Sequence, residues 1–176
     1  VYLMDHDREQ RRDVLRCLSL ETGQDIWRFS YPVEIRRNHG ITRTVPAVNE
    51  KYVVSMGPKG HTCCLDAATG ALIWAIDLVG RFGTTIPQWN TGQCPLIDGD
   101  RVILAPAGTA LLIAVDLATG ELQWETPNPR GWKMTHSSVM PVRFADRDTF
   151  VYVASGGVVG VDATDGAQLW EVVDWK

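Results

Sequence analysis

The chain has 176 residues, of which 45% are hydrophobic and 22% charged, and its formal net charge is −4 at pH 7. This composition is typical of a globular chain with enough apolar residues to bury a sizeable core. The net negative charge argues against binding to nucleic acid through its phosphates, and no apolar run is long enough to span a membrane. We therefore expect neither a nucleic-acid partner nor a membrane span.

A segment of eleven residues recurs four times. Each copy has a hydrophobic run, a turn that ends in Gly, and a Trp four residues after that Gly. The copies are CLSLETGQDIW (17–27), CLDAATGALIW (64–74), AVDLATGELQW (114–124) and GVDATDGAQLW (160–170). Successive copies place their Trp residues 46 to 50 residues apart. A period of this length, filled with short β-like runs, matches one four-stranded blade of a β-propeller.

The polar residues of each copy are predicted to shape its turn. Three copies have an Asp four residues before the Gly, and the first copy has Ser19 instead. A short side chain there can accept hydrogen bonds from turn amides, and Gly can adopt a positive φ. We favour this structural role over catalysis by the acids. The residues assigned to it are Gly23, Gly70, Gly120, Gly166, Asp66, Asp116 and Asp162.

The Trp of each copy is predicted to pack between blades. Burial of an indole removes ~150–250 Å² from water, and Trp27, Trp74, Trp124 and Trp170 recur at one position of the repeat. A platform for a cofactor or a sugar would instead require aromatic residues at the mouth of the propeller.

The predicted fold class is all-β, a β-propeller of four-stranded antiparallel blades in an incomplete ring. Pro46, Pro95 and Pro141 each precede a repeat Gly by 24 or 25 residues and are predicted to open inner strands. The first blade lacks such a strand, so we expect a fragment whose open faces are covered by the remaining blades or by self-association. The predicted blades are residues 1–31 (incomplete), 42–78, 92–128 and 137–175.

The D-x-x-T-G-x-x-x-W turn with its upstream Pro resembles the pyrroloquinoline-quinone (PQQ) repeat over essentially the whole chain. The resemblance implies relatives of two kinds: quinoprotein dehydrogenases of alcohols or sugars with eight blades, and a non-enzymatic lipoprotein of the outer-membrane β-barrel assembly machinery. It also implies PQQ with calcium as a possible cofactor and a periplasmic or secreted location. The repeat builds blades, so any activity must be argued from other residues.

Three predicted loops join an outer strand to the next inner strand and carry aromatic and polar side chains. Equivalent loops of a propeller lie at one mouth, where such side chains suit a flat, polar or anionic small molecule. The alternative is that they satisfy backbone groups and line a wet channel. The candidate ligand-binding residues are His39, Arg43, Thr44, Trp89, Asn90, Gln93, Trp132, Lys133, His136 and Ser137, with Thr91 and Ser138 in the same loops.

No catalytic residue and no metal ligand is assigned. Calcium prefers six to eight oxygen ligands, and the candidate loop residues include the amides of Asn90 and Gln93 but no Asp or Glu. Three functions stay open. The first is a binding or interaction scaffold without redox chemistry in this segment, the second is part of a PQQ- and calcium-dependent dehydrogenase, and the third is an envelope protein-assembly factor.

Cys63 and Cys64 are adjacent, and the resemblance implies that some quinoproteins carry a disulfide between such neighbours beside the cofactor. Adjacent Cα atoms lie ~3.8 Å apart, which is shorter than the ~4.4–6.8 Å usual across a disulfide. A strand also directs neighbouring side chains to opposite faces. We therefore expect two packed thiols.

The charged segment HDREQRRD, residues 6–13, mixes both signs of charge. We expect it to be a solvated hairpin tip rather than a nucleic-acid site.

Overall fold

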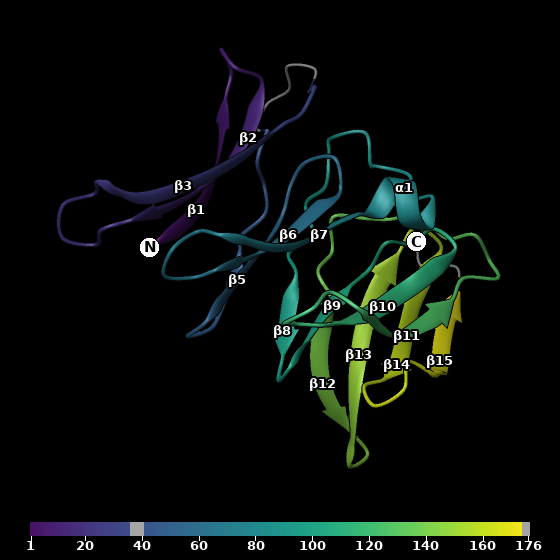
Figure 1. Cartoon of the computed structure of the whole chain (residues 1–176). Coiled ribbons are helices and arrows are strands. Elements are labelled where there is room, and N and C mark those ends of the chain that lie inside the picture. The colour runs from purple at the N-terminus through teal and green to yellow at the C-terminus, as the bar shows by residue number, and fades with distance from the viewer. Residues whose placement is uncertain (36–40, 174–176) are drawn as a thin grey trace.

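The computed structural model describes residues 1–35 and 41–173, which form four antiparallel sheets and one short helix. The sheets follow one another in chain order, from the N-terminal sheet in purple to the C-terminal sheet in yellow-green (Figure 1). Within each sheet, strands adjacent in sequence are paired. The predicted all-β fold of an incomplete propeller is confirmed.

The N-terminal sheet has three strands, and the second sheet has four. The N-terminal sheet consists of β1 (Tyr2–Asp7), β2 (Arg12–Leu18) and β3 (Asp25–Pro32). The second sheet consists of β4 (Ala47–Val48), β5 (Tyr52–Met56), β6 (His61–Asp66) and β7 (Leu72–Asp77).

The third and fourth sheets have four strands each. The third consists of β8 (Leu96–Asp98), β9 (Arg101–Leu104), β10 (Ala110–Asp116) and β11 (Leu122–Pro127). The fourth consists of β12 (Met140–Phe144), β13 (Arg147–Ala154), β14 (Gly157–Asp162) and β15 (Gln168–Val173).

The helix α1 (Leu78–Phe82) follows β7 directly and was not among the elements expected from the sequence. The Asp77 side chain accepts a hydrogen bond from the amide of Val79, and Gly83 ends the helix at φ 65°. Only one turn forms, so the sequence offers too little helical periodicity to detect it.

The repeated turn has the same hydrogen bonds in successive sheets. Asp116 Oδ1 accepts from the amides of Ala118 and Thr119 at 3.0 and 2.8 Å, and Gly120 adopts φ 74°. These bonds stabilise the carboxylate and therefore lower the pKa of Asp116. Asp66 and Asp162 also accept from turn amides, whereas Ser19 Oγ accepts from the amide of Thr22 at 3.2 Å.

A β-bulge follows each turn and orients the repeat Trp. In the second sheet, Cys64 pairs with Trp74 but the next residue, Leu65, pairs with Leu72, so Ile73 is the extra residue. The other sheets show the same shift of register. Because a bulge re-aims the side chains that follow it, each copy presents its Trp in the same direction.

Three of these indoles lie against the turn Gly of the following sheet. A Cβ built on Gly70 would lie 2.6 Å from the Trp27 ring, and one on Gly166 would lie 2.4 Å from the Trp124 ring. Trp27 Nε1 also donates to the carbonyl of Ala67 at 3.1 Å. The turn Gly of one sheet thus forms the surface against which the Trp of the preceding sheet packs.

The core lies between the sheets. The larger cluster joins the second, third and fourth sheets and includes the fully buried Leu104, Ile113 and Tyr152. A smaller cluster joins the first two sheets through Leu15 and Val53, among others. Burial between sheets explains why the middle strands are almost continuously apolar.

The expected solvated tip of the charged hairpin is present at residues 8–11, but the expectation was wrong for Asp13. Arg8 and Arg11 are exposed at its tip, but Asp13 is fully buried. Asp13 lies opposite Tyr31 in the β2–β3 register, and its Oδ2 accepts a 2.7 Å hydrogen bond from the Tyr31 hydroxyl. The alternation of β2 directs Asp13 toward the second sheet, where Gly57 leaves room for both groups.

Candidate functional site

A pocket of about 840 Å³ lies where loops of the first two sheets meet, and it is lined by residues from four segments. These are the β1–β2 hairpin, the segment after β3, the turn between β5 and β6, and the loop before β8. In a four-stranded blade, hairpins between the second and third strands lie on the same side as the loops between blades. The pocket therefore opens on one face of the propeller.

Cations predominate in the pocket lining. Arg8 and Arg11 come from the β1–β2 hairpin, and Lys59 comes from the β5–β6 turn. Glu34 contributes the carboxylate of the lining and forms a 3.8 Å ion pair with Arg11, in which both side chains are largely exposed. The pocket therefore carries positive charge on a chain whose net charge is negative.

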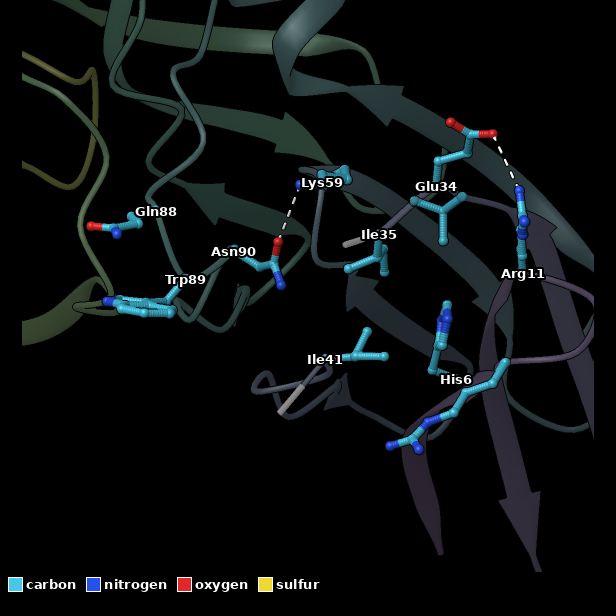
Figure 2. Close-up of a pocket in the computed structure, with 11 residues that line it drawn as sticks. His6, Arg11, Glu34, Ile35, Ile41, Lys59, Gln88, Trp89 and Asn90 are labelled. Atoms are coloured by element: carbon cyan, nitrogen blue, oxygen red, sulfur yellow. Dashed lines mark hydrogen bonds and ion pairs between the residues drawn. The ribbon is translucent and has the colours of Figure 1, made fainter. Parts of the chain in front are cut away.

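Asn90 supplies a buried amide at one side of the pocket. Its side chain is 4% exposed, and its Oδ1 accepts a hydrogen bond from Lys59 Nζ at 3.2 Å. Its Nδ2 has no hydrogen-bond partner among the described residues. Figure 2 shows this nitrogen pointing away from Lys59 and toward the side of the pocket where Ile35 and Ile41 lie.

The backbone of Asn90 explains how the loop holds this orientation. Asn90 has φ 70°, a conformation that Asn tolerates better than most residues. Its amide donates to the carbonyl of Pro87 at 2.9 Å, and its carbonyl contacts His136 Nε2 at 3.1 Å. The backbone of Asn90 is thus held by contacts from two loops.

His6 lies at the opposite side of the pocket (Figure 2). Its partial burial, and secondarily the charge of Arg8, lower the pKa of the imidazole. Its Nδ1 is buried and has no partner among the described residues. A neutral imidazole in this position can donate or accept one hydrogen bond inside the pocket.

Two of the loop residues proposed from the sequence line this pocket. They are Asn90 and Trp89, and the Trp89 side chain is 45% exposed. His136 reaches the same loop through the Asn90 carbonyl. Arg43 is exposed outside the pocket lining. His39 lies outside the described residues.

Other candidate residues bond to the backbone of the blades. Thr44 Oγ1 donates to the carbonyl of Met56 at 2.6 Å, and Thr91 Oγ1 donates to that of Gly57 at 2.6 Å. Gln93 is fully buried and exchanges two hydrogen bonds with the backbone of Ala105. These polar atoms hold the loops against the strands.

The last loop lies apart from the pocket lining. Trp132 is buried against Gly156 and Gly157 of the fourth sheet. Lys133 is exposed, and its amide donates to Ser155 Oγ at 2.8 Å. The amide of Ser137 donates to Thr135 Oγ1 within the loop itself.

The cationic side of the pocket was not predicted from the sequence. Arg8 and Arg11 belong to the segment interpreted as a solvated tip, and Lys59 received no role. Lys59 stands in the short PKG turn between two strands of a blade, which places it on the same face as the loops that were considered. This placement of Lys59 in a turn between strands was the signal from which its position near the pocket could have been predicted.

The four cysteines are free thiols. Cys63 and Cys64 lie side by side on β6, where burial raises the pKa of each thiol to about 12. The expectation of two packed thiols agrees with this arrangement. A high pKa suppresses the thiolate, which is the reactive form of cysteine.

The described residues fit a calcium–quinone centre poorly. Within ranges 1–35 and 41–173, no three His, Cys, Asp or Glu side chains gather closely enough to hold a metal ion. Both polar atoms of the Gln93 side-chain amide are hydrogen-bonded to the backbone, and Asn90 Oδ1 is hydrogen-bonded to Lys59. Among the same residues, no helix is long and apolar enough to cross a membrane.

Four successive antiparallel sheets, each with the same turn between its last two strands, define a β-propeller built from PQQ-like repeats. A family model described as outer membrane protein assembly factor BamB matches residues 11–173. The chain belongs to that family. No curated protein matches it in sequence.

Solved structures of two functional kinds share the fold. BamB from Moraxella catarrhalis superposes with a TM-score of 0.65 at 16% identity, covering 98% of this chain and 49% of that one. The quinohemoprotein alcohol dehydrogenase from Comamonas testosteroni gives 0.65 at 17% identity, with 98% and 33% covered. A europium-containing methanol dehydrogenase gives 0.63 at 13% identity, with 98% and 39% covered.

The chain thus spans about half the length of the BamB structure and about a third of the alcohol dehydrogenase. At these identities the likeness establishes the fold alone.

Proposed function

We propose that this chain is part of a PQQ-like propeller that acts as a binding scaffold, without redox chemistry in this segment. The observation that carries the proposal is the pocket between the first two sheets, in which Lys59 and Asn90 form a fixed polar pair. The buried Thr44, Thr91 and Gln93 support it, because they hold the surrounding loops rigid. A rigid rim favours binding, since little order is lost when a ligand docks.

We further propose that the sheets act as blades with the limits 1–31, 42–78, 92–128 and 137–175, and that the remaining blades of a ring cover their open faces. Strand β12 supports this, because Met140 and Phe144 on it are 62% and 65% exposed. Besides the remaining blades, we propose a small polar ligand or a protein as a partner of this chain. Membership of the BamB-described family favours a location in the periplasm or cell envelope.

The scaffold is tested by calorimetric titration of the whole protein that contains this chain with PQQ, with and without calcium. We expect no calcium-dependent binding of PQQ. Calcium-dependent binding of one PQQ, accompanied by dye-linked oxidation of an alcohol or a sugar, would contradict the scaffold and support the dehydrogenase.

A second candidate is an envelope protein-assembly factor, favoured by the family model over residues 11–173. This role predicts a stable protein partner that binds through an exposed loop or sheet edge. The test is affinity purification of the whole protein from envelope extracts, with a variant that carries Arg8→Glu and Lys59→Glu as the control for the pocket face. Recovery of no envelope protein above the level of an unrelated bait would count against this role.

A further inference from the structure

The pocket between the first two sheets has positive groups at two separated sides and an apolar middle. Figure 2 shows Ile35 and Ile41 between Lys59 and Asn90 on one side and His6 and Arg11 on the other. Its volume of about 840 Å³ lies within the ~300–1,000 Å³ usual for sites of small molecules.

We propose that this pocket binds a small organic dianion whose two carboxylates are separated by an apolar body. One carboxylate faces the side of the pocket that carries Lys59 Nζ and Asn90 Nδ2, and the other faces the β1–β2 hairpin with Arg8 and His6. The inference rests on the proposed binding role and deepens it by naming the class of ligand.

The buried amide of Asn90 is the strongest reason for the first carboxylate position. A buried donor without a partner destabilises the fold, and Asn90 Nδ2 is such a donor in a side chain that is 4% exposed. Lys59 Nζ already donates a hydrogen bond to Asn90 Oδ1. This bond orients the amide so that its nitrogen lies on the pocket side. The Lys59 ammonium and the Asn90 N–H group lie on the same side of the pocket, where they offer a charge-assisted site for a carboxylate.

The hairpin gives the reason for the second position. Arg8 has no ion pair with a carboxylate of the described residues, in contrast to Arg11, which faces Glu34. His6 Nδ1 is likewise buried without a partner in the part of the chain that the structure describes. Between the two positions, Ile35 and Ile41 offer apolar surface that favours a hydrocarbon or aromatic body over a wholly polar one.

The proposal is tested by calorimetry of the whole protein that contains this chain with naphthalene-2,6-dicarboxylate at low ionic strength. Naphthalene-2-carboxylate and naphthalene-2,6-dimethanol serve as the monoanionic and neutral controls. We expect the dianion to bind one molecule per chain, about tenfold or more tighter than the monoanion, with no binding of the diol. The affinity falls as salt is added, because the attraction is between charges.

Two variants locate the site. Asn90→Asp keeps the size of the side chain, its tolerance of positive φ and the bond to Lys59, but it replaces the N–H donor by a carboxylate oxygen. Arg8→Gln removes a charge from the exposed hairpin tip, where no fold contact is lost, and it keeps the test valid if Asn90→Asp misfolds. The matched control is Arg143→Gln, because Arg143 is an exposed arginine of the fourth sheet.

We expect Asn90→Asp and Arg8→Gln each to weaken binding of the dianion about tenfold, and Arg143→Gln to leave it within about twofold. Absence of dianion binding at millimolar concentration would overturn the proposal, as would equal losses in Arg8→Gln and Arg143→Gln. Neither result involves PQQ or calcium, so the scaffold role would stand if this inference failed.

Discussion

The indole of Trp74 lies against Gly120 of the following sheet. A Cβ built on Gly120 would lie 2.8 Å from the ring, and Trp74 Nε1 donates a 2.9 Å hydrogen bond to the carbonyl of Leu117 in the same turn. The turn Gly is therefore required twice, once for its φ of 74° and once for the space that the indole fills. The repeat thus encodes both a turn and a contact between sheets.

This double requirement predicts different outcomes at two equivalent glycines. Gly23 has φ 71° in the turn of the first sheet, but nothing lies within 4 Å of a Cβ built there. Gly23→Ala therefore destabilises the fold by about 1–2 kcal/mol through backbone strain alone. Gly120→Ala adds overpacking against Trp74, which contributes a further ~1–3 kcal/mol. Urea unfolding of the two variants measures the difference.

Equal losses of stability in Gly23→Ala and Gly120→Ala would show that the Trp74 contact is unimportant. The double variant Trp74→Leu with Gly120→Ala provides a further check. It is expected to lose less than the two single variants together, because the clash is absent once the indole is removed.

Two other repeat residues form a second matched pair. Trp74 Nε1 is bonded to the Leu117 carbonyl, whereas Trp124 Nε1 is buried with no partner among the described residues. Trp74→Phe leaves the buried Leu117 carbonyl with only the weaker 3.6 Å hydrogen bond from Cys64 Sγ, but Trp124→Phe removes an unpaired donor. We expect Trp74→Phe to lose about 1–2 kcal/mol more in the free energy of unfolding. A larger loss for Trp124→Phe in denaturant titrations would contradict this explanation.

Asp13 predicts a pH dependence of stability that can be isolated by one substitution. Burial raises its pKa from 3.8 to about 6 in the folded state. The folded chain therefore holds a proton that the unfolded chain has lost between these values. This contribution is fully present below pH 3.8 and is lost as the pH rises through about 6, which amounts to about 3 kcal/mol.

The substitution Asp13→Asn removes that dependence while it keeps an acceptor for the Tyr31 hydroxyl. We expect the free energy of unfolding of the variant, relative to the natural chain, to rise between pH 4 and pH 7. The comparison must be made at each pH, because the lowered pKa of Asp116 makes its turn lose stability as the pH falls. A constant difference across this range would show that Asp13 ionises normally.

The thiols are expected to react in a defined order. Cys94 is only partly buried and its Sγ accepts a hydrogen bond from the amide of Val45, whereas Cys17, Cys63 and Cys64 are buried. Because burial also raises the pKa of Cys63 and Cys64 to about 12, iodoacetamide at pH 8 modifies Cys94 first and the β6 pair only after unfolding. Peptide mass spectrometry checks the order. Early labelling of Cys63 or Cys64, or a mass consistent with a disulfide between them, would refute it.

The architecture was predictable because its signals are local. Each turn needs an acceptor side chain and a Gly within five residues, as at Asp66 and Gly70, and this local chemistry repeats at the period of a blade. The placement of Asp13 was not predictable in the same way. The residues before it in sequence, Arg11 and Arg12, are charged, but its neighbours in space are Tyr31 and Gly57. Burial of that carboxyl depends on which face of β2 meets the second sheet.

The candidate site was likewise predictable only in part from the sequence. Trp89 and Asn90 line the pocket, whereas Thr44 and Gln93 in equivalent loops turn inward to bond the backbone. Whether a polar side chain faces a ligand or a strand end depends on the local path of its loop. A one-dimensional pattern does not contain that path.

By itself the sequence determined the blade repeat, because turn chemistry and strand alternation act over a few residues. Only the tertiary structure decided that His6, Lys59 and Asn90 meet around one pocket, since they come from separate hairpins and loops. It also decided which charges are buried and which amide is left without a partner. Those properties arise from the packing of one sheet on the next, which joins residues that the sequence keeps far apart.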